Sequence, residues 1–324
     1  MKEVTEPVLE VGDEFSEEEV KDIKIRFSYP LVTRLYPDDP NLVRFTEKRK
    51  EAFKKKFMYR RRVHVPEKGY VDVDVYQIWI PNHPYMFYLL GYLYGDGFFE
   101  QDRDRCVIVT TPYHISKGRR YGMKYGEVYE IIHRAGFIFG NDNVSIRLLT
   151  YKDKKKVETI DVLSFDEYYK ISRYKYPYLR QIRIEMKVPI EFNRVFFKHS
   201  HFCIFPYNIL EKIFNLEFLA GLYDADGYRD RPIIVSACKE FLEKIRELLH
   251  LHLSTDLSTI LRYAPITRTK KARTFIYQYN NNIYAISKVQ WHLRLHKKAP
   301  FFKKLSDAML KYLVCEEKRD AFLK

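Results

Sequence analysis

Residues 219–227 read LAGLYDADG, and residues 89–97 read LLGYLYGDG. Both stretches are mostly apolar, hold two small residues four positions apart, and end in Asp-Gly. The small pairs are Gly91 with Gly95 and Gly221 with Ala225. Residues four apart share one face of a helix, so each stretch predicts an apolar helix with a narrow face. Asn82 and Asn215 precede the stretches as candidate N-caps, and the closing glycines predict left-handed C-caps.

The same order of elements follows each stretch. A short charged turn leads into an apolar strand, over 106–111 in the first copy and 233–237 in the second. A helix is predicted next, near 124–135 and near 239–251. The interval between the copies is too long for a solenoid repeat, so it indicates a duplicated domain.

Packing the two predicted helices through their small faces would bring their C-terminal ends together, with Asp96 beside Asp226. Neighbouring carboxylates repel each other, and the last carbonyl groups of each helix add negative potential. Such a site suits a divalent cation with oxygen ligands, such as Mg²⁺. A cation held there can activate water and stabilise the leaving oxygen of a phosphodiester.

Residues 219–227 differ at one position from LAGLIDADG, the name motif of a family of homing endonucleases, and residues 89–97 are a looser match. Residues 81–324 therefore resemble the monomeric, two-motif branch of that family. The resemblance implies an α+β fold of two pseudo-symmetric αββαββα halves, whose antiparallel sheets form a DNA-binding saddle. It also implies a site-specific double-strand DNA endonuclease that uses Mg²⁺ (or Mn²⁺) and leaves 3′ overhangs.

The metal ligands implied by the resemblance are the carboxylates of Asp96 and Asp226. The main-chain carbonyl groups of Gly95 and Ala225, directly before them, would be further ligands.

Other positions follow the motif less closely. Tyr94 replaces the first motif aspartate, which Asp224 retains, and the resemblance implies that this position packs or caps. The family also places basic residues near the scissile phosphates. Lys297, just before the last predicted helices, is the candidate in the second half, and Lys187 is the candidate in the first.

Polar and apolar residues alternate along 181–188 and, less cleanly, along 273–280. Alternation with period two predicts strands with one outward polar face, and Arg, Lys and Gln on such a face can read base edges. The predicted DNA contacts are Gln181, Arg183, Glu185, Lys187, Arg262, Arg268, Arg273 and Gln278. The predicted partner is double-stranded DNA with a long asymmetric target site, and intron RNA is the alternative partner.

Composition agrees with a nucleic-acid partner. The 324 residues carry 57 Lys+Arg against 43 Asp+Glu, a net charge of +14, and 46% are hydrophobic, enough for a sizeable core. We expect an N-terminal extension over 1–80, with a basic helix near 48–62 that would grip nucleic acid, and two domains over 81–205 and 206–324.

The four cysteines are far apart and form no CxxC pair, which argues against a zinc module or a disulfide framework. The sequence shows no secretion signal and no uncharged apolar run of about 20 residues. We therefore expect a monomer in a reducing compartment inside the cell, in the cytoplasm or nucleoid or in an organelle, with no membrane partner.

Several alternatives stay open. The same fold could serve an RNA maturase or a DNA-binding regulator that does not cut. Glu185-x-Lys187, with Asp161 on a neighbouring strand, would match another nuclease class. His292 and His296 lie four apart, a spacing that would allow metal binding on a helix.

Overall fold

The computed structural model describes the following residues: 22–28, 59–65, 69–100, 103–112, 114–116, 119–152, 155–162, 179–188, 192–193, 196, 198, 203, 205–279 and 282–323. No helix within these residues combines the length and the apolar character that crossing a membrane requires.

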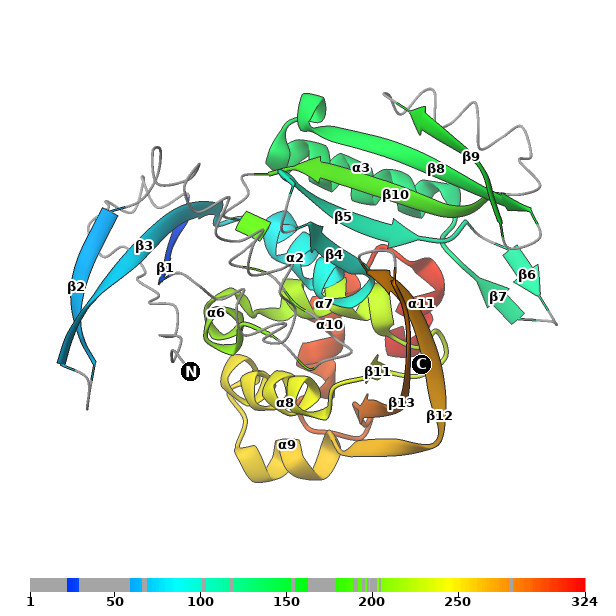
Figure 1. The fold of residues 1–324 in the computed structure, drawn as a ribbon. Coiled ribbons are helices and arrows are strands. Elements are labelled where there is room, and N and C mark those ends of the chain that lie inside the picture. The colour runs from blue at the N-terminus through cyan, green and yellow to red at the C-terminus, as the bar shows by residue number, and fades with distance from the viewer. Residues whose placement is uncertain are drawn as a thin grey trace.

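The first half packs one long helix against an antiparallel sheet. Its elements, in chain order, are α2 (Pro84–Asp96), β4 (Gly97–Glu100), β5 (Arg105–Thr110), β6 (His114–Ser116), β7 (Arg119–Tyr121), α3 (Tyr125–Phe139), a 3₁₀ turn (Asn141–Asn143), β8 (Val144–Lys152), β9 (Lys155–Val162) and β10 (Leu179–Lys187). The sheet has the order β4-β5-β10-β8-β9, and α3 covers one of its faces, while β6 and β7 form a separate hairpin (Figure 1).

The second half also contains its motif helix, which is followed by a strand, helices and an antiparallel strand pair. Its elements are α6 (Tyr207–Ile213), α7 (Leu216–Asp226), β11 (Ile233–Ser236), α8 (Lys239–Leu253), α9 (Leu257–Tyr263), β12 (Ile266–Tyr279), β13 (Asn282–Arg294), α10 (Phe302–Tyr312) and α11 (Glu316–Leu323). Its sheet has the order β11-β13-β12 and is also antiparallel. The predicted strands and helices after each motif are therefore confirmed.

Helices α2 and α7 lie in the middle of the molecule, between the two halves (Figure 1). Every residue from Met86 to Tyr94 in α2 and from Phe218 to Asp224 in α7 is buried. A helix that is apolar around its whole circumference is stable only when protein surrounds it, so these two helices form the centre of the core.

The ends of the two helices correct two predictions. Asn215 caps α7 as predicted, its side chain accepting from the N–H of Phe218 at 2.8 Å, but the cap of α2 is His83 rather than Asn82. Gly97 and Gly227 are extended, with φ of −111° and −82°, because the chain passes straight from each helix into sheet pairing. Glycine is needed there for space, since a Cβ on Gly97 would lie 2.6 Å from the Cα of Leu93.

A third antiparallel sheet is formed by β1 (Asp22–Ser28), β3 (Gly69–Pro81) and β2 (Tyr59–Val65), in the order β1-β3-β2. The predicted basic helix is wrong over residues 59–62. These residues form the start of β2, and each of them pairs with a residue of β3. Tyr59, Val63 and Val65 favour a strand over a helix. Residues 48–58 lie outside the described part of the chain.

Candidate active site

The two motif helices contact each other through their glycines. A Cβ built on Gly91 would lie 1.9 Å from the carbonyl oxygen of Phe218, and one built on Gly221 would lie 1.9 Å from that of Tyr88. One turn further along, a Cβ on Gly95 would lie 2.3 Å from the Cβ of Ala225. Side-chain-free surfaces of this kind let two backbones touch, so the predicted packing of the small faces is confirmed.

This packing brings Asp96 and Asp226 to the same end of the helix pair. A Cβ on Gly95 would lie 3.3 Å from Oδ2 of Asp226, so the second carboxylate faces the last turn of the first helix. Loss of hydration, followed by repulsion from Asp96, raises the pKa of Asp226 to about 7. Asp96 keeps part of its surface in solvent, yet protein atoms crowd its carboxyl group, and this desolvation raises its pKa as well.

Two buried lysines lie at this end, one for each helix. Nζ of Lys198 donates to the carbonyl oxygens of Tyr94 and Gly95, both at 2.6 Å. Nζ of Lys318, in α11, donates to the carbonyl oxygens of Asp224 at 2.6 Å and of Ala225 at 3.0 Å. A cation on the last carbonyl groups of a helix is favoured by the helix dipole. Each lysine therefore caps the C-terminal end of one motif helix, next to the aspartate that ends that helix.

Both lysines also balance the charge of the aspartates. Their positive charges lower the pKa of Asp96 and of Asp226, against the larger effect of desolvation. Desolvation in turn lowers the pKa of Lys198 to about 8, although the two aspartates oppose this shift. The carboxylates of Asp96 and Asp226 and the ammonium groups of Lys198 and Lys318 thus interact with one another at this end of the helix pair.

Both lysines that the sequence suggested are exposed, and their role near a scissile phosphate stays a prediction. Lys187 is exposed at the end of β10, and Lys297 is exposed in the turn before α10. Lys198 and Lys318 were missed by sequence reasoning. Neither stands in a local pattern that separates it from other lysines, and the carbonyl groups they contact are roughly a hundred residues away in the chain.

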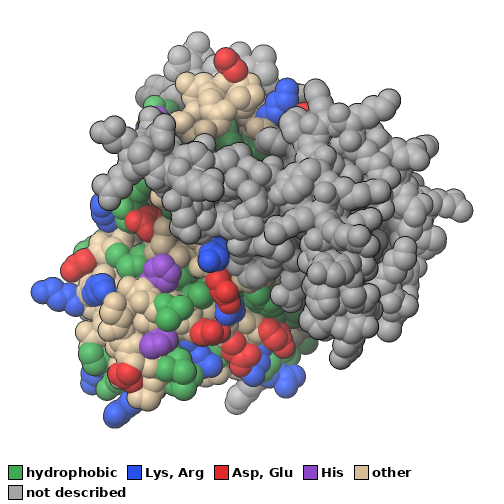
Figure 2. All heavy atoms as spheres, turned by 90° about the vertical axis from the view of Figure 1, so that its left-hand side faces the viewer, with side chains coloured by type: hydrophobic (Ala, Val, Ile, Leu, Met, Phe, Trp, Pro, Cys, Tyr) green, Lys and Arg blue, Asp and Glu red, His purple; other side chains and the backbone are tan. Residues whose placement is uncertain are grey.

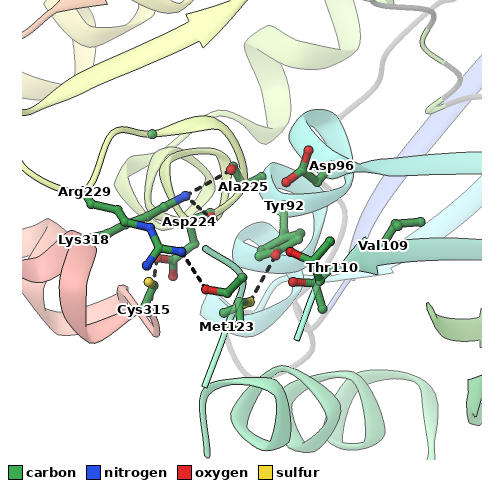
Figure 3. A pocket seen from close by; sticks show the side chains of 13 residues that line it. Tyr92, Asp96, Val109, Thr110, Met123, Asp224, Ala225, Arg229, Cys315 and Lys318 are labelled. Atoms are coloured by element: carbon green, nitrogen blue, oxygen red, sulfur yellow. Dashed lines mark hydrogen bonds between the residues drawn. The ribbon is translucent and has the colours of Figure 1, made fainter. Parts of the chain in front are cut away.

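A cavity of about 300 Å³ opens beside the centre. Side chains that line it include Tyr92, Asp96, Thr110, Asp224, Arg229 and Lys318. Figure 3 shows Lys318 directed at the end of α7, with Asp96 on the other side of Ala225. Arg229 is held by Glu317 and by the carbonyl oxygen of Gly122 at 2.6 Å, so it adds a fixed positive charge to the cavity wall.

The residues at the centre fit a divalent metal ion. The candidate ligands are hard oxygen atoms of the type that Mg²⁺ and Mn²⁺ prefer: two carboxylates, and the carbonyl oxygens of Gly95 and Ala225, each of which already accepts from a lysine and has a second lone pair. Because Gly95 has no side chain, Ala225 and the carboxylate of Asp226 can approach the end of α2 closely. A carboxylate pair whose pKa is raised by crowding is stabilised when a cation joins it.

The two positions of the first motif aspartate differ. Asp224 is buried and accepts from the hydroxyl of Tyr88 at 2.7 Å and from the backbone N–H groups of Val314 at 2.6 Å and Cys315 at 3.2 Å. It therefore anchors the chain that enters α11. Tyr94, its counterpart, packs against Phe218 and Phe241, with ring centroids 5.4 and 6.4 Å apart. The expected packing and capping roles are confirmed.

We expect Tyr94→Phe to stabilise the protein by about 1 kcal/mol. The Tyr94 hydroxyl is buried and finds no hydrogen-bond partner among the described residues, so removing it relieves a desolvation cost without leaving a donor unsatisfied. Urea unfolding checks this. Tyr223→Phe is the matched control and should be destabilising by a similar amount, because its hydroxyl donates to the carbonyl oxygen of Arg231 at 2.7 Å. A loss of stability in Tyr94→Phe would contradict the assignment.

We expect Asp226→Asn to raise the Tm of the metal-free protein near pH 8. The pKa of Asp226 is about 7 in the folded protein and lower in the unfolded chain, so the folded wild type binds this proton more tightly. The wild type therefore gains stability as the pH falls through this range, whereas asparagine is neutral throughout. Thermal melts in EDTA should show the advantage shrinking toward about pH 5. Asp142→Asn, an exposed change after α3, should show no such trend.

The predicted alternation along β10 is confirmed with one exception. Ile182, Ile184 and Met186 face the core, while Gln181, Arg183 and Lys187 are partly or fully exposed. Glu185 is only 5% exposed although it lies on the polar face. Two arginines from neighbouring strands cover it.

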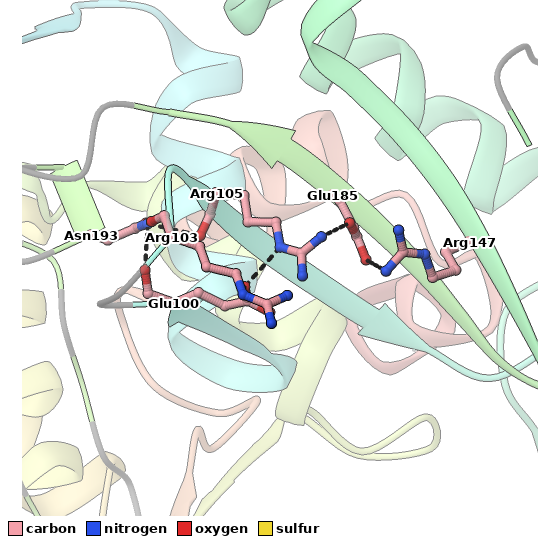
Figure 4. A network of polar contacts seen from close by, with 6 residues as sticks. All are labelled: Glu100, Arg103, Arg105, Arg147, Glu185 and Asn193. Carbon is pink, nitrogen blue, oxygen red and sulfur yellow. Dashed lines mark hydrogen bonds and ion pairs between the residues drawn. The ribbon is translucent and has the colours of Figure 1, made fainter. Parts of the chain in front are cut away.

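Those arginines form a charged network on the first sheet (Figure 4). Arg105 in β5 donates to Glu185 at 2.6 Å and to Glu100 at 2.7 Å, and Arg147 in β8 lies 3.3 Å from the other oxygen of Glu185. On this face of the first sheet, the side chains of Arg105 and Arg147 are therefore more exposed than that of Glu185. A DNA contact by Glu185 itself stays a prediction.

Of the four DNA contacts predicted in the second half, the structure describes the side chains of two. Arg262 at the end of α9 and Arg268 in β12 are exposed. Arg273 and Gln278 belong to β12, and their side chains lie outside the described part of the chain.

Two alternative sites are wrong. Asp161 is in β9, which pairs with β8, so β8 separates it from Glu185 in β10. His292 and His296 share no helix: His292 is buried in β13, and His296 follows the end of that strand. The chain around the histidines alternates between apolar and polar residues, with Trp291, Leu293 and Leu295 as the apolar ones. This period of two is typical of a strand, and β13 pairs with β11 and β12.

Comparisons with known proteins add one distant structure. No family model matches the sequence, and no curated protein gives a significant match. Among solved structures, the fold is similar to the homing endonuclease I-WcaI bound to its DNA recognition sequence. The identity is 12%, the match covers 74% of this chain and 85% of that one, and the TM-score is 0.39. At this identity and TM-score, the likeness says nothing about the function of this chain.

Proposed function

We propose that this protein is a site-specific double-strand DNA endonuclease of the LAGLIDADG homing type, acting as a monomer. The observation that carries the proposal is the contact of α2 and α7 through Gly91 and Gly221, which unites Asp96 and Asp226 at one end. A shared acidic centre between two similar halves suits a duplex, whose two strands present two phosphodiesters.

Asp96 and Asp226 would hold Mg²⁺ or Mn²⁺, with the carbonyl groups of Gly95 and Ala225 as added ligands. When bound, the metal supplies an activated water and stabilises the leaving oxygen. Lys198 and Lys318 hold the helix ends in place and supply two positive charges, so the centre does not repel an entering phosphate. Because the carboxylates must be ionised to bind metal, the apparent affinity for Mg²⁺ should weaken as the pH falls below about 7.

The two sheets would contact the DNA on either side of this centre. Arg105, Arg147 and Arg183 lie on the polar side of the first sheet, and Arg268 lies on β12 of the second. The described part of the face in Figure 2 shows acidic and basic side chains mixed together, with no continuous basic patch. We assign the DNA to the sheets and propose that cleavage leaves 3′ overhangs.

A binding selection tests the proposal without knowledge of the target. The Asp96→Asn/Asp226→Asn protein selects duplexes from a random library, and the wild type is then given the selected duplex with Mg²⁺. We expect one double-strand cut at a fixed position, with binding that weakens steeply with salt. Specific binding without any cut in Mg²⁺ or Mn²⁺ would refute an endonuclease and favour a non-cutting regulator. A parallel selection with structured RNA tests the maturase alternative.

A further inference from the structure

A second group of potential metal ligands lies away from the proposed nuclease centre. The thiols of Cys203 and Cys238 and the carboxylate of Glu240 place their ligand atoms within 4.8 Å of one another. Sγ of Cys238 and the carboxylate of Glu240 are 3.1 Å apart. The sequence argued against a zinc module because the cysteines are distant, but the fold brings these two together.

We infer that Cys203, Cys238 and Glu240 form a binding site for one thiophilic divalent cation, with Zn²⁺ as the natural occupant. Two thiolates and a carboxylate are a ligand set that tetrahedral Zn²⁺ accepts, with water in the fourth position. Zinc–sulfur bonds of about 2.3 Å require thiolates roughly 3.8 Å apart. The observed ligand atoms lie within 4.8 Å of one another, close to that separation.

The surroundings agree with a site that ions can enter. Cys238 is buried, Cys203 is half-buried and Glu240 is exposed, so a path from solvent exists. Cys238 is the N-cap residue of α8, and Glu240 lies in the first turn, where the helix dipole favours negative charge. Lys239, between them in the chain, adds a nearby positive charge that lowers the pKa of Glu240, and it also pairs with Glu243 at 2.7 Å.

The backbone at Cys203 gives an independent sign of a functional position. Its φ is 55°, in the left-handed region that residues other than glycine rarely adopt. Strain of this kind persists where the surroundings hold a side chain in one place. Here the strained residue directs its thiol at Cys238 and Glu240, since both have their pKa shifted by a hydrogen bond with Cys203.

Binding would release protons and join two parts of the chain. Cysteine binds Zn²⁺ as the thiolate, so binding at Cys203 and Cys238 would release protons. Cys203 precedes α6, in the connection between the halves, and Cys238 opens α8. The bound ion would therefore fasten that connection to the second half and stabilise the folded state.

Cobalt binding to the reduced, full-length protein tests the inference independently of cleavage. Excess Mg²⁺ is present to occupy the oxygen ligands at Asp96 and Asp226. We expect one equivalent of Co²⁺ to give a thiolate-to-cobalt charge-transfer band, Zn²⁺ to abolish it, and Zn²⁺ to raise the Tm. Cys203→Ser and Cys238→Ser should each lose the band. Glu240→Gln should keep it with roughly tenfold weaker affinity, and Cys106→Ala, in β5, should bind as the wild type does.

A second measurement needs no variant. Zn²⁺ should slow alkylation of Cys203 in the wild type by tenfold or more, as peptide mass mapping would show. Absence of the band, its persistence in Cys238→Ser, or unprotected alkylation of Cys203 would overturn the inference. So would a Cys203–Cys238 disulfide in protein isolated with its thiols trapped, since a disulfide cannot bind the ion.

Discussion

Asp96→Asn and Asp226→Asn should each reduce double-strand cleavage by about 100-fold or more, which corresponds to a loss of roughly 3 kcal/mol of transition-state stabilisation. Asparagine keeps the size of the side chain but loses the negative charge that holds a divalent ion. The carboxylates are close enough for Asp96 to raise the pKa of Asp226, so they act on a shared region. Losing either one should therefore impair cutting of both strands.

The same variants should bind DNA at least as tightly as the wild type when no divalent metal is present. Each change removes a negative charge from a site that receives a phosphate. Gel shifts in EDTA and cleavage assays in Mg²⁺, on the selected duplex, separate the two effects. Asp142→Asn, which removes an exposed carboxylate outside the cavity lining, is the control and should cut normally. If either single variant cuts both strands at the wild-type rate, Asp96 and Asp226 are not the catalytic pair.

The helix pair was predictable because its signal is local. Small residues four apart, inside an apolar stretch that ends in Asp-Gly, are visible in nine letters, and the copy after Asn215 repeats them. Packing of the two small faces then follows from sterics alone. Since each motif ends in Asp-Gly, this packing also brings Asp96 and Asp226 to the same end of the helix pair.

The rest of the site depends on long-range contacts that no local pattern records. Lys198 matters because it reaches the carbonyl oxygens of Tyr94 and Gly95, and backbone acceptors have no sequence signature. Glu185 follows the predicted alternation, yet Arg105 and Arg147 from adjacent strands bury it. The glycines after the helices were predicted as left-handed C-caps, but strand pairing, which depends on distant residues, extends them instead.

Gly91→Ala and Gly221→Ala should each destabilise the protein by about 3 kcal/mol. An added Cβ on either glycine would lie 1.9 Å from a carbonyl oxygen of the other helix. Because backbone rather than a flexible side chain occupies that space, the helices themselves must move apart. Urea or guanidinium unfolding measures the loss, provided that the slope of the transition is unchanged.

Gly126→Ala is the matched control, because it is a glycine in α3 whose added Cβ would have no atom within 4 Å. Without a clash, the better helix propensity of alanine should stabilise by up to about 1 kcal/mol, the opposite sign. The double variant Gly91→Ala/Gly221→Ala should lose less than the sum of the single losses, since separation caused by the first methyl group makes room for the second. Wild-type stability in either single variant would mean that α2 and α7 do not touch through these glycines, and the shared acidic centre would have no basis.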